Sequence, residues 1–322
     1  MFKRLALAGA TLALAMSALA QDYPTRSVTM VVPYAAGGPT DTVARVLAQA
    51  MTKPMGQTVI VENKPSAGGI LGPQFVKNAK PDGYTILIHH IGMSTIPALY
   101  RNPGFDPLKD FEYIGLVNDV PMTIIGKPGL PAKDLKELLA YLKANKDKVT
   151  YANAGIGAAS HLCGMLFMTA IQTDILTVPY KGTGPAMNDL IGGQVDFMCD
   201  QTTSTTSQIK SGKVKAYAIT SPKRVASLPD LPTLQEQGLK GAEVGIWHGL
   251  YAPKGTPKPV IDKLVAALQE TLKDATVQKR FAELGATTYP PEKATPAALQ
   301  QHLKAEIDKW SPLIKKAGVY AD

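Results

Sequence analysis

The chain lacks several features that would assign a function directly. Its 322 residues include only two cysteines, and no G-x-S-x-G, H-E-x-x-H, C-x-x-C or P-loop motif occurs. Hydrophobic residues make up 45% and charged residues 19% of the chain, which is typical of a globular protein and excludes general disorder, collagen and coiled coil. We therefore expect no catalytic residue, no cofactor and no metal.

A concentrated positive patch is also missing. The chain has 34 Lys and Arg residues against 26 Asp and Glu residues, a net charge of +8. The densest basic stretches are residues 143–148 and 210–215. They are interrupted by other residues and contain no aromatic residue, so binding of nucleic acid is not expected. A mild, dispersed positive charge suits an anionic small ligand.

The N-terminus has the pattern of a secretory signal peptide. A short basic start precedes the apolar run Leu5–Ala20, which ends in an A-x-A cleavage site before Gln21. An uncleaved anchor helix is the alternative, but this run is shorter than the roughly 20 residues needed to cross a bilayer. We expect residues 1–20 to be removed and a soluble, periplasmic mature protein to begin at Gln21.

Short apolar runs alternate with amphipathic segments along the mature chain. This alternation predicts a doubly wound, mostly parallel α/β sheet. The expected strands are Val28–Val32, Thr58–Glu62, Tyr84–Ile88, Val149–Ala152, Ile175–Pro179, Val195–Cys199, Ala216–Thr220 and Ile246–Ala252. Near the C-terminus, one apolar helical stripe runs from Val260 to Leu272 and is expected to close near Gly285. A last helix begins after Thr295 and ends at Gly318.

Proline- and glycine-rich stretches at residues 127–131 and 238–245 are the candidate linkers. They predict one domain made of residues 21–126 and 244–322, and a second domain made of residues 127–243. The chain would then cross twice between the domains, with both ends of the mature chain in the first.

Glycine-rich loops follow the predicted strands and lead into helices. In open α/β sheets, ligands bind beyond the carboxyl ends of the strands. The N–H groups at a helix start, together with the helix dipole, form an anion site. The loops at residues 33–41, 66–69, 152–161 and 179–185 contain few arginines. The expected donors are therefore backbone N–H groups and hydroxyls that hold a small carboxylate.

The two cysteines, Cys163 and Cys199, leave two readings open. Export into an oxidising compartment permits a disulfide between them. Two separate buried thiols are equally compatible with the sequence, because spacing alone does not fix the distance between the two side chains.

Several motifs in register resemble one known family. The segment Pro33–Arg45 is similar to the P-[YF]-x-x-G-G-x-x-D-x-x-A-R signature of Bug-type (TctC-like) proteins, the extracytoplasmic solute-binding receptors of tripartite tricarboxylate transporters. The segment Val61–Gly69 resembles their second motif, with Pro65-Ser66 replacing the usual small-residue pair. Further matches follow in order at residues 81–85, 178–182, 192–196 and 249–257, so the resemblance covers nearly the whole mature chain.

The resemblance implies a two-domain periplasmic-binding-protein fold of the Venus-flytrap, type II-like class, with a carboxylate in the interdomain cleft. It also implies delivery of the ligand to a two-component membrane permease. We expect a monomer. The ligand-binding residues carried over or inferred from the loops are Tyr34, Gly37, Gly38, Asp41, Ser66, Gly68, His89, His90, Gly157, Ser160, Tyr180, Gly182, Asp200 and Trp247.

Departures from the family pattern lie where specificity is expected. His89-His90 replace small polar residues, and Trp247-His248 stand where a different aromatic pair is more common. These residues favour an aromatic carboxylate or a dicarboxylate, with an aliphatic dicarboxylate or an acidic amino acid as the rival ligands. Two other functions remain open: a ligand-binding module for a periplasmic sensor system, and a secreted hydrolase that uses Ser160.

Overall fold

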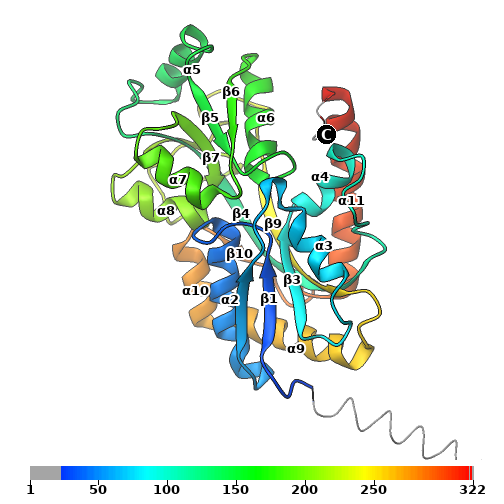
Figure 1. Ribbon diagram of the computed structural model, residues 1–322. Helices are drawn as coiled ribbons and strands as arrows, with labels where there is room; N and C mark the ends of the chain where they lie inside the picture. The colour runs from blue at the N-terminus through cyan, green and yellow to red at the C-terminus, as the bar shows by residue number, and fades with distance from the viewer. Residues whose placement is uncertain (1–22, 319, 321–322) are drawn as a thin grey trace, which may run out of the picture.

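The computed structural model describes residues 23–318 and 320, and the predicted signal peptide and Gln21 lie outside this part. The described chain forms two α/β domains, one above the other in Figure 1, with strands β4 and β9 running between them. The predicted two-domain α/β fold class is confirmed, but the prediction of a mostly parallel sheet is wrong, because β4 and β9 pair antiparallel with their neighbours. No helix within the described residues is both long and apolar enough to cross a membrane.

The first domain, which fills the lower part of Figure 1, includes the first and the last elements of the described chain, and the C-terminal end itself lies at the upper right of the view. Its N-terminal elements are β1 (Val28–Val32), α2 (Pro39–Met55), β2 (Val59–Asn63), the 3-10 turn η1 (Ala67–Gly69), α3 (Leu71–Lys77), β3 (Thr85–His90) and α4 (Gly92–Leu99). Its C-terminal elements are β9 (Gly245–Pro253), α9 (Lys258–Lys273), α10 (Ala275–Glu283), β10 (Thr287–Thr288) and α11 (Pro296–Ala317).

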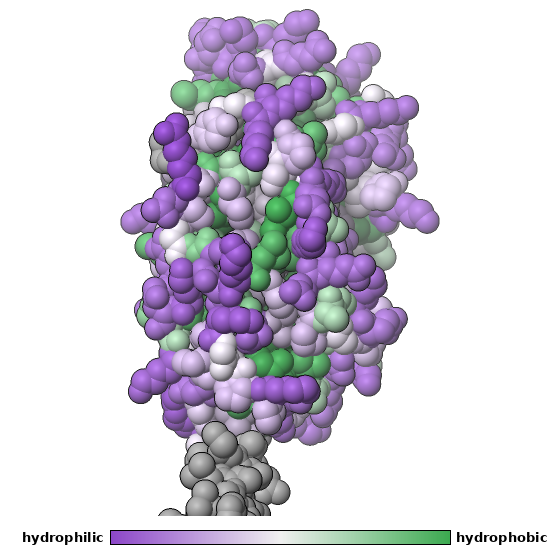
Figure 2. Space-filling view, turned by 90° about the vertical axis from the view of Figure 1, so that its right-hand side faces the viewer, coloured by the Kyte–Doolittle hydropathy of each residue, from purple (hydrophilic) through white to green (hydrophobic). Residues whose placement is uncertain are grey.

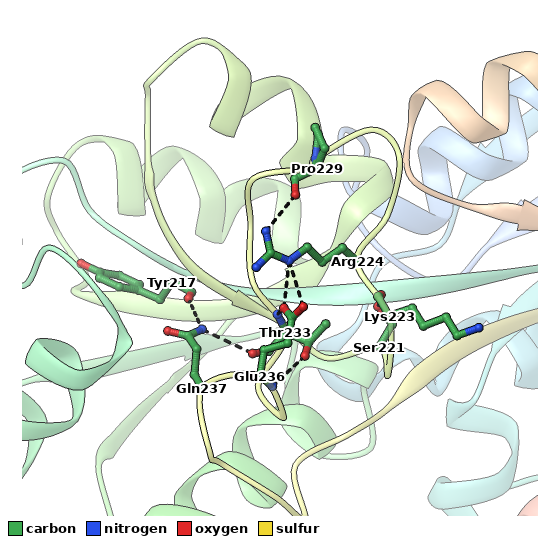
Figure 3. Close-up of polar contacts among 8 residues, drawn as sticks. All are labelled: Tyr217, Ser221, Lys223, Arg224, Pro229, Thr233, Glu236 and Gln237. Carbon is green, nitrogen blue, oxygen red and sulfur yellow. Dashed lines mark hydrogen bonds and ion pairs between the residues drawn. The ribbon is translucent and has the colours of Figure 1, made fainter.

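The second domain follows the long strand β4 (Phe111–Gly126). Its elements are α5 (Leu135–Ala144), β5 (Thr150–Asn153), α6 (Ala159–Ile171), β6 (Leu176–Pro179), α7 (Thr183–Ile191), β7 (Phe197–Gln201), α8 (Thr202–Lys210) and β8 (Lys215–Ile219). Arg224 stabilises the loop between β8 and β9. Its Nε donates to Glu236 Oε2 at 2.9 Å, and its Nη1 donates to the carbonyl oxygen of Pro229 at 3.1 Å (Figure 3).

Strand β4 joins the two sheets. Its first part, Phe111–Pro121, pairs antiparallel with β9, and its second part, Met122–Gly126, pairs antiparallel with β7 and, in part, β8. Within each domain the central pairs are parallel, β1 with β2 and β3, and β5 with β6 and β7. The partners of β4 thus change between Pro121 and Met122. The domain boundaries predicted from the sequence, at residues 126/127 and 243/244, remain a prediction.

The core sits on both faces of the central strands. Val28, Met30, Val31 and Val32 of β1 are all fully buried, as expected for a parallel strand with helices on both sides. By contrast, the side of the molecule in Figure 2 is mostly hydrophilic, and hydrophobic side chains appear there only in narrow strips.

Local signals explain the helix ends. The hydroxyl of Thr295 accepts a hydrogen bond from the N–H of Ala298 at 3.2 Å, and Gly318 adopts the left-handed conformation with φ 66°, as the sequence predicts. The sequence predicted one helical stripe from Val260 that closes near Gly285, and this prediction is wrong. Asp274 follows the last residue of α9 and caps α10, because its carboxylate accepts a hydrogen bond from the N–H of Thr276 at 2.7 Å. The segment therefore forms two consecutive helices instead of one.

Candidate ligand-binding cleft

Four helices begin at the interface between the domains. Each follows a strand directly: α2 after β1, α6 after β5, α7 after β6 and α8 after β7. A helix N-terminus carries unpaired N–H groups and about half a positive charge. The four starts therefore create a region of positive potential between the domains without any cationic side chain.

A narrow cavity, partly open to its surroundings, lies at this point. Its lining residues come from the starts of all four helices and from β3: Tyr34, Gly38, Pro39, Thr40, His90, Ala154, Ala158, Ala159, Ser160, Thr183, Asp200 and Gln201. Only about 20 Å³ of the cavity is open to the centre of a water molecule, which is room for about one water. The lining holds one carboxylate and one imidazole, but neither lysine nor arginine.

Hydrogen bonds across the cleft hold the two domains in contact. The N–H groups of Ala35 and Gly68 donate to Lys181 O at 3.0 Å and Ala154 O at 2.8 Å. From α4 and the residue after it, Thr95 donates to Gly157 O at 3.0 Å and Tyr100 to Ile156 O at 2.8 Å. The structure therefore represents a closed arrangement of the two domains.

Glycine is required where the backbones approach most closely. Gly68 has φ 73°, and a Cβ there would collide with Ile156 O and the Tyr100 hydroxyl. Gly182 has φ 146°, and its Cβ would come within 2.9 Å of Ala35 N. Because of these close approaches, Gly68 and Gly182 serve the contact between domains rather than the cavity lining.

The wall contributed by the first domain is aromatic and uncharged. Tyr34 stacks on His90 with ring centroids 5.0 Å apart, and His90 is 3% exposed. Burial lowers the pKa of His89 to about 4 and that of His248 to about 3, and it holds the pKa of His90 well below 6.5. All three imidazoles are therefore neutral near pH 7.

The hydrogen-bond network sets the tautomer of His90. Its Nδ1 lies 2.9 Å from the N–H of Gly92 and accepts this hydrogen bond. A neutral imidazole that accepts at Nδ1 carries its hydrogen on Nε2. His90 is thus a neutral N–H donor in the cavity wall.

The wall contributed by the second domain carries the only carboxylate of the lining. Asp200 is 1% exposed, and burial raises the pKa of its carboxyl group to about 7. Ser160, at the start of α6, accepts a hydrogen bond from the N–H of Ala154 at 2.9 Å. A disulfide joins Cys163 of α6 to Cys199 of β7, with their Cα atoms 6.1 Å apart, and links the elements that carry Ser160 and Asp200.

The structure brings together only part of the predicted site. The predicted residues that line the cavity are Tyr34, Gly38, His90, Ser160 and Asp200. Four others lie in the contact between the domains or directly behind it, namely Gly68, His89, Gly157 and Gly182. Gly37 lines a separate open groove between α2 and α8.

Three predicted side chains have other partners. Asp41 accepts from Gly37 N–H at 3.0 Å and pairs with Arg45 at 2.9 Å, so it braces the loop before α2. Ser66 accepts from the N–H of Leu71 at 3.1 Å. The hydroxyl of Tyr180 donates to Asp189 at 2.7 Å.

The structure places Trp247 outside the cavity. Neighbouring residues of a strand point to opposite faces, and on β9 it is His248 that lies on the cleft side, 3.4 Å from the Thr40 hydroxyl. Trp247 packs against His302 of α11 at 4.8 Å and donates to Glu306 at 3.3 Å.

Some lining residues were not among the predicted site residues. Thr40, Thr183 and Gln201 provide polar groups, and four apolar residues, Pro39, Ala154, Ala158 and Ala159, complete the lining. Their position in the sequence could have identified most of them, because they lie within two residues of the start of a helix that follows a strand.

Comparison with known proteins decides the family. The model of the tripartite tricarboxylate transporter family receptor, TctC, matches residues 43–319. This chain belongs to the TctC family. The predicted relationship to Bug-type solute-binding receptors is confirmed, and receptors of this kind are periplasmic.

Relatives of this TctC-family receptor match almost its whole length. A UPF0065 protein in the TAR-I ttuE-ttuC' intergenic region of Agrobacterium vitis is 52% identical over 302 residues, covering 94% of this chain and 87% of that protein. The solved structure of the periplasmic binding protein BugD is 60% identical, with a TM-score of 0.90, and the match covers 92% of this chain and 99% of that one.

A third relative was solved with a ligand. MatC from Rhodopseudomonas palustris, with bound malate, is 40% identical and has a TM-score of 0.87, over 91% of this chain and all of that one. The two-domain receptor fold is therefore shared across this range of identity.

Proposed function

We propose that this TctC-family receptor captures a small carboxylate in the cavity between its domains and delivers it to a two-component membrane permease. The observation that carries the proposal is the convergence of four helix N-termini on one cavity that lacks lysine and arginine. Such a site binds an anion through N–H groups and helix dipoles. The malate bound by MatC supports the same class of ligand.

The size of the cavity favours a short aliphatic acid over an aromatic one. The rings of Tyr34 and His90 stack on each other, so these two rings fill their shared space rather than sandwich a third ring. Only about 20 Å³ of the cavity is open to the centre of a water molecule, which leaves no room for an additional aromatic ring in this closed arrangement. We therefore place aliphatic dicarboxylates and acidic amino acids ahead of aromatic acids.

Two alternatives predict different behaviour. A sensor module would bind the same ligand but would act on a membrane receptor, and pull-down with the permease subunits distinguishes the two. A hydrolase needs a base beside Ser160, yet the hydrogen bond of its hydroxyl comes from the N–H of Ala154. Nothing in this arrangement favours hydrolysis of a bound compound. We expect Ser160→Ala to weaken ligand binding, and we expect neither the unaltered protein nor this variant to hydrolyse the ligand.

The test is a thermal-shift screen of residues 21–322 with aliphatic, aromatic and amino-acid carboxylates, each paired with its methyl ester. A ligand at a hundredfold excess over its Kd stabilises the fold by about 2.7 kcal/mol. We expect a shift with the acid and none with the ester, and the compound should be recovered unchanged. Equal shifts for acid and ester would refute an anion site, and an altered compound would indicate an enzyme.

A further inference from the structure

Two segments of the chain connect the domains, and the side chain of Thr220 joins these segments. In the first segment, β4 changes its pairing partners between Pro121 and Met122. The second segment passes through Val244 into β9, whose first residue, Gly245, pairs with Pro121. Thr220 follows the last residue of β8 and is fully buried. Because hinges consist of a few residues at the ends of elements, Thr220 lies where the movement of the domains is controlled.

The hydroxyl of Thr220 makes one hydrogen bond to each connecting segment. Its oxygen accepts from the N–H of Met122 at 2.9 Å, and the hydroxyl donates to the carbonyl oxygen of Val244 at 2.6 Å. The backbone N–H of Thr220 also donates to Met122 O at 2.8 Å, which fastens the residue to β4. Both bonds of the hydroxyl are buried, so its removal would leave buried backbone groups without this partner.

The surroundings of Thr220 leave its hydroxyl little freedom. The preceding residue, Ile219, is held by the loop between β8 and β9, because its N–H donates to Pro232 O at 3.0 Å. The ion pair between Arg224 and Glu236, 2.9 Å long, in turn stabilises this loop (Figure 3). A threonine side chain is itself stiff because it branches at Cβ. The hydroxyl is therefore fixed in place between the two connecting segments.

Strand β4 links this contact to the cavity between the domains. Met122 pairs with Gln201 at the end of β7, and Gln201 lines the cavity. The hydroxyl of the next residue, Thr123, donates to the carbonyl oxygen of Asp200 at 3.2 Å. Val244, on the other side of the Thr220 hydroxyl, leads into β9 of the first domain. A shift of Met122 relative to Val244 would therefore move one wall of the cavity relative to the other.

We propose that Thr220 is a positioning residue for ligand capture. Its hydroxyl fastens the two connecting segments to each other, so that the domains move about a single hinge axis and the two walls of the cavity meet in one arrangement. Without the hydroxyl, β4 and the segment that enters β9 would shift separately, and the domains would adopt a broader range of relative orientations. This inference goes beyond the proposed function, because it concerns the movement of the domains and does not depend on which acid binds.

Three variants isolate the hydroxyl. Thr220→Val keeps the shape of the side chain and removes the hydroxyl, whereas Thr220→Ser keeps the hydroxyl and removes the methyl group. Thr52→Val is the matched control. The hydroxyl of Thr52 also accepts from a backbone N–H, that of Val59 at 3.2 Å, and donates to a carbonyl oxygen, that of Ala48 at 2.9 Å, but all three residues belong to the first domain. This control loses equivalent hydrogen bonds without touching the connecting segments.

Distances between spin labels on the two domains measure the range of orientations. The labels are placed by Lys80→Cys and Lys136→Cys, at exposed positions of the first and the second domain. The two native cysteines are joined in a disulfide and do not react with the label. Double electron–electron resonance is recorded on residues 21–322 without ligand and with an excess of malate. We expect Thr220→Val to widen the distribution of distances about twofold, because two buried hydrogen bonds that restrain the hinge are lost. The unaltered protein, Thr220→Ser and Thr52→Val should share one narrower distribution.

The outcomes separate this proposal from the proposed function. The assignment of Thr220 is overturned if Thr220→Val keeps the narrow distribution under both conditions, or if Thr220→Ser or Thr52→Val becomes as broad as Thr220→Val. The ligand-free measurement decides this even where malate does not bind, whereas failure of the proposed function would show as a lack of binding in the carboxylate screen. Melting curves establish that each variant is folded, and Thr220→Ala, which also lacks the hydroxyl and is smaller, replaces Thr220→Val if the latter does not fold.

Discussion

The carboxyl group of Asp200 makes a quantitative prediction about stability. Burial raises its pKa to about 7 from an ordinary value of 3.8. The folded state therefore binds a proton more strongly than the unfolded state between these two values. Each unit of pKa difference corresponds to about 1.4 kcal/mol, so this residue alone should lower the free energy of unfolding by about 4 kcal/mol as the pH rises from below 4 to above 7.

Asp200→Asn isolates this effect. Asparagine keeps the shape of the side chain and one acceptor oxygen but never ionises. The variant should have nearly the stability of the unaltered protein at pH 4 and be more stable at pH 8, by up to about 4 kcal/mol. The histidines, whose lowered pKa values act in the opposite sense, are present in both proteins and cancel in the difference.

Urea unfolding of both proteins without ligand, at intervals between pH 4 and pH 8, measures this difference. The reasoning requires the gap between the two free energies of unfolding to widen with pH and to level off above about pH 7. A gap that stays constant within 1 kcal/mol across the range would show that the Asp200 carboxylate is not desolvated in the folded protein, and the argument from its burial would fail.

Three further predictions concern other parts of the molecule. The disulfide closes a loop with a sequence separation of 36, so Cys163→Ser with Cys199→Ser should lower the free energy of unfolding by about 3–4 kcal/mol, and dithiothreitol should have no further effect on that variant's melting temperature. Tyr100→Phe removes the hydrogen bond to Ile156 O and should speed ligand dissociation about fivefold in stopped-flow measurements, whereas Tyr141→Phe on α5 should not. His248 is buried and neutral with its pKa lowered to about 3, so its contribution to stability is present above pH 6.5 and declines toward pH 3. His248→Asn should therefore flatten the acid limb of a stability profile, and an unchanged limb would contradict this account.

The sequence predicts the regular parts of the fold well. Each of its eight expected strands overlaps an observed one, because most of these segments are short, apolar and bounded by turn residues. The long strand β4 was not predicted. It contains Gly115, Asn118, Asp119 and Pro121, which are rare in strands, and its pairing depends on partners from both domains. Such pairing is a tertiary property that local patterns do not carry.

The candidate site was harder to predict than the fold, for a geometric reason. The motif residues Asp41 and Gly68 belong to conspicuous patterns, yet they shape a loop and a domain contact rather than the cavity. Gln201 and Thr183 belong to no motif and still line the cavity, because they stand where a strand ends and a helix begins. Which of these positions face inward depends on how the domains close.

This distribution also bears on specificity. A site that holds carboxylates through helix starts depends on backbone groups, which side-chain substitutions leave in place. The chemical choice among acids then falls to the few side chains that reach the same space, above all His90 from the first domain and the Asp200–Gln201 pair from the second. Because these side chains come from opposite domains, a ligand in the cavity would contact both walls of the closed cleft at once, so we expect the choice among acids to be made in the closed arrangement.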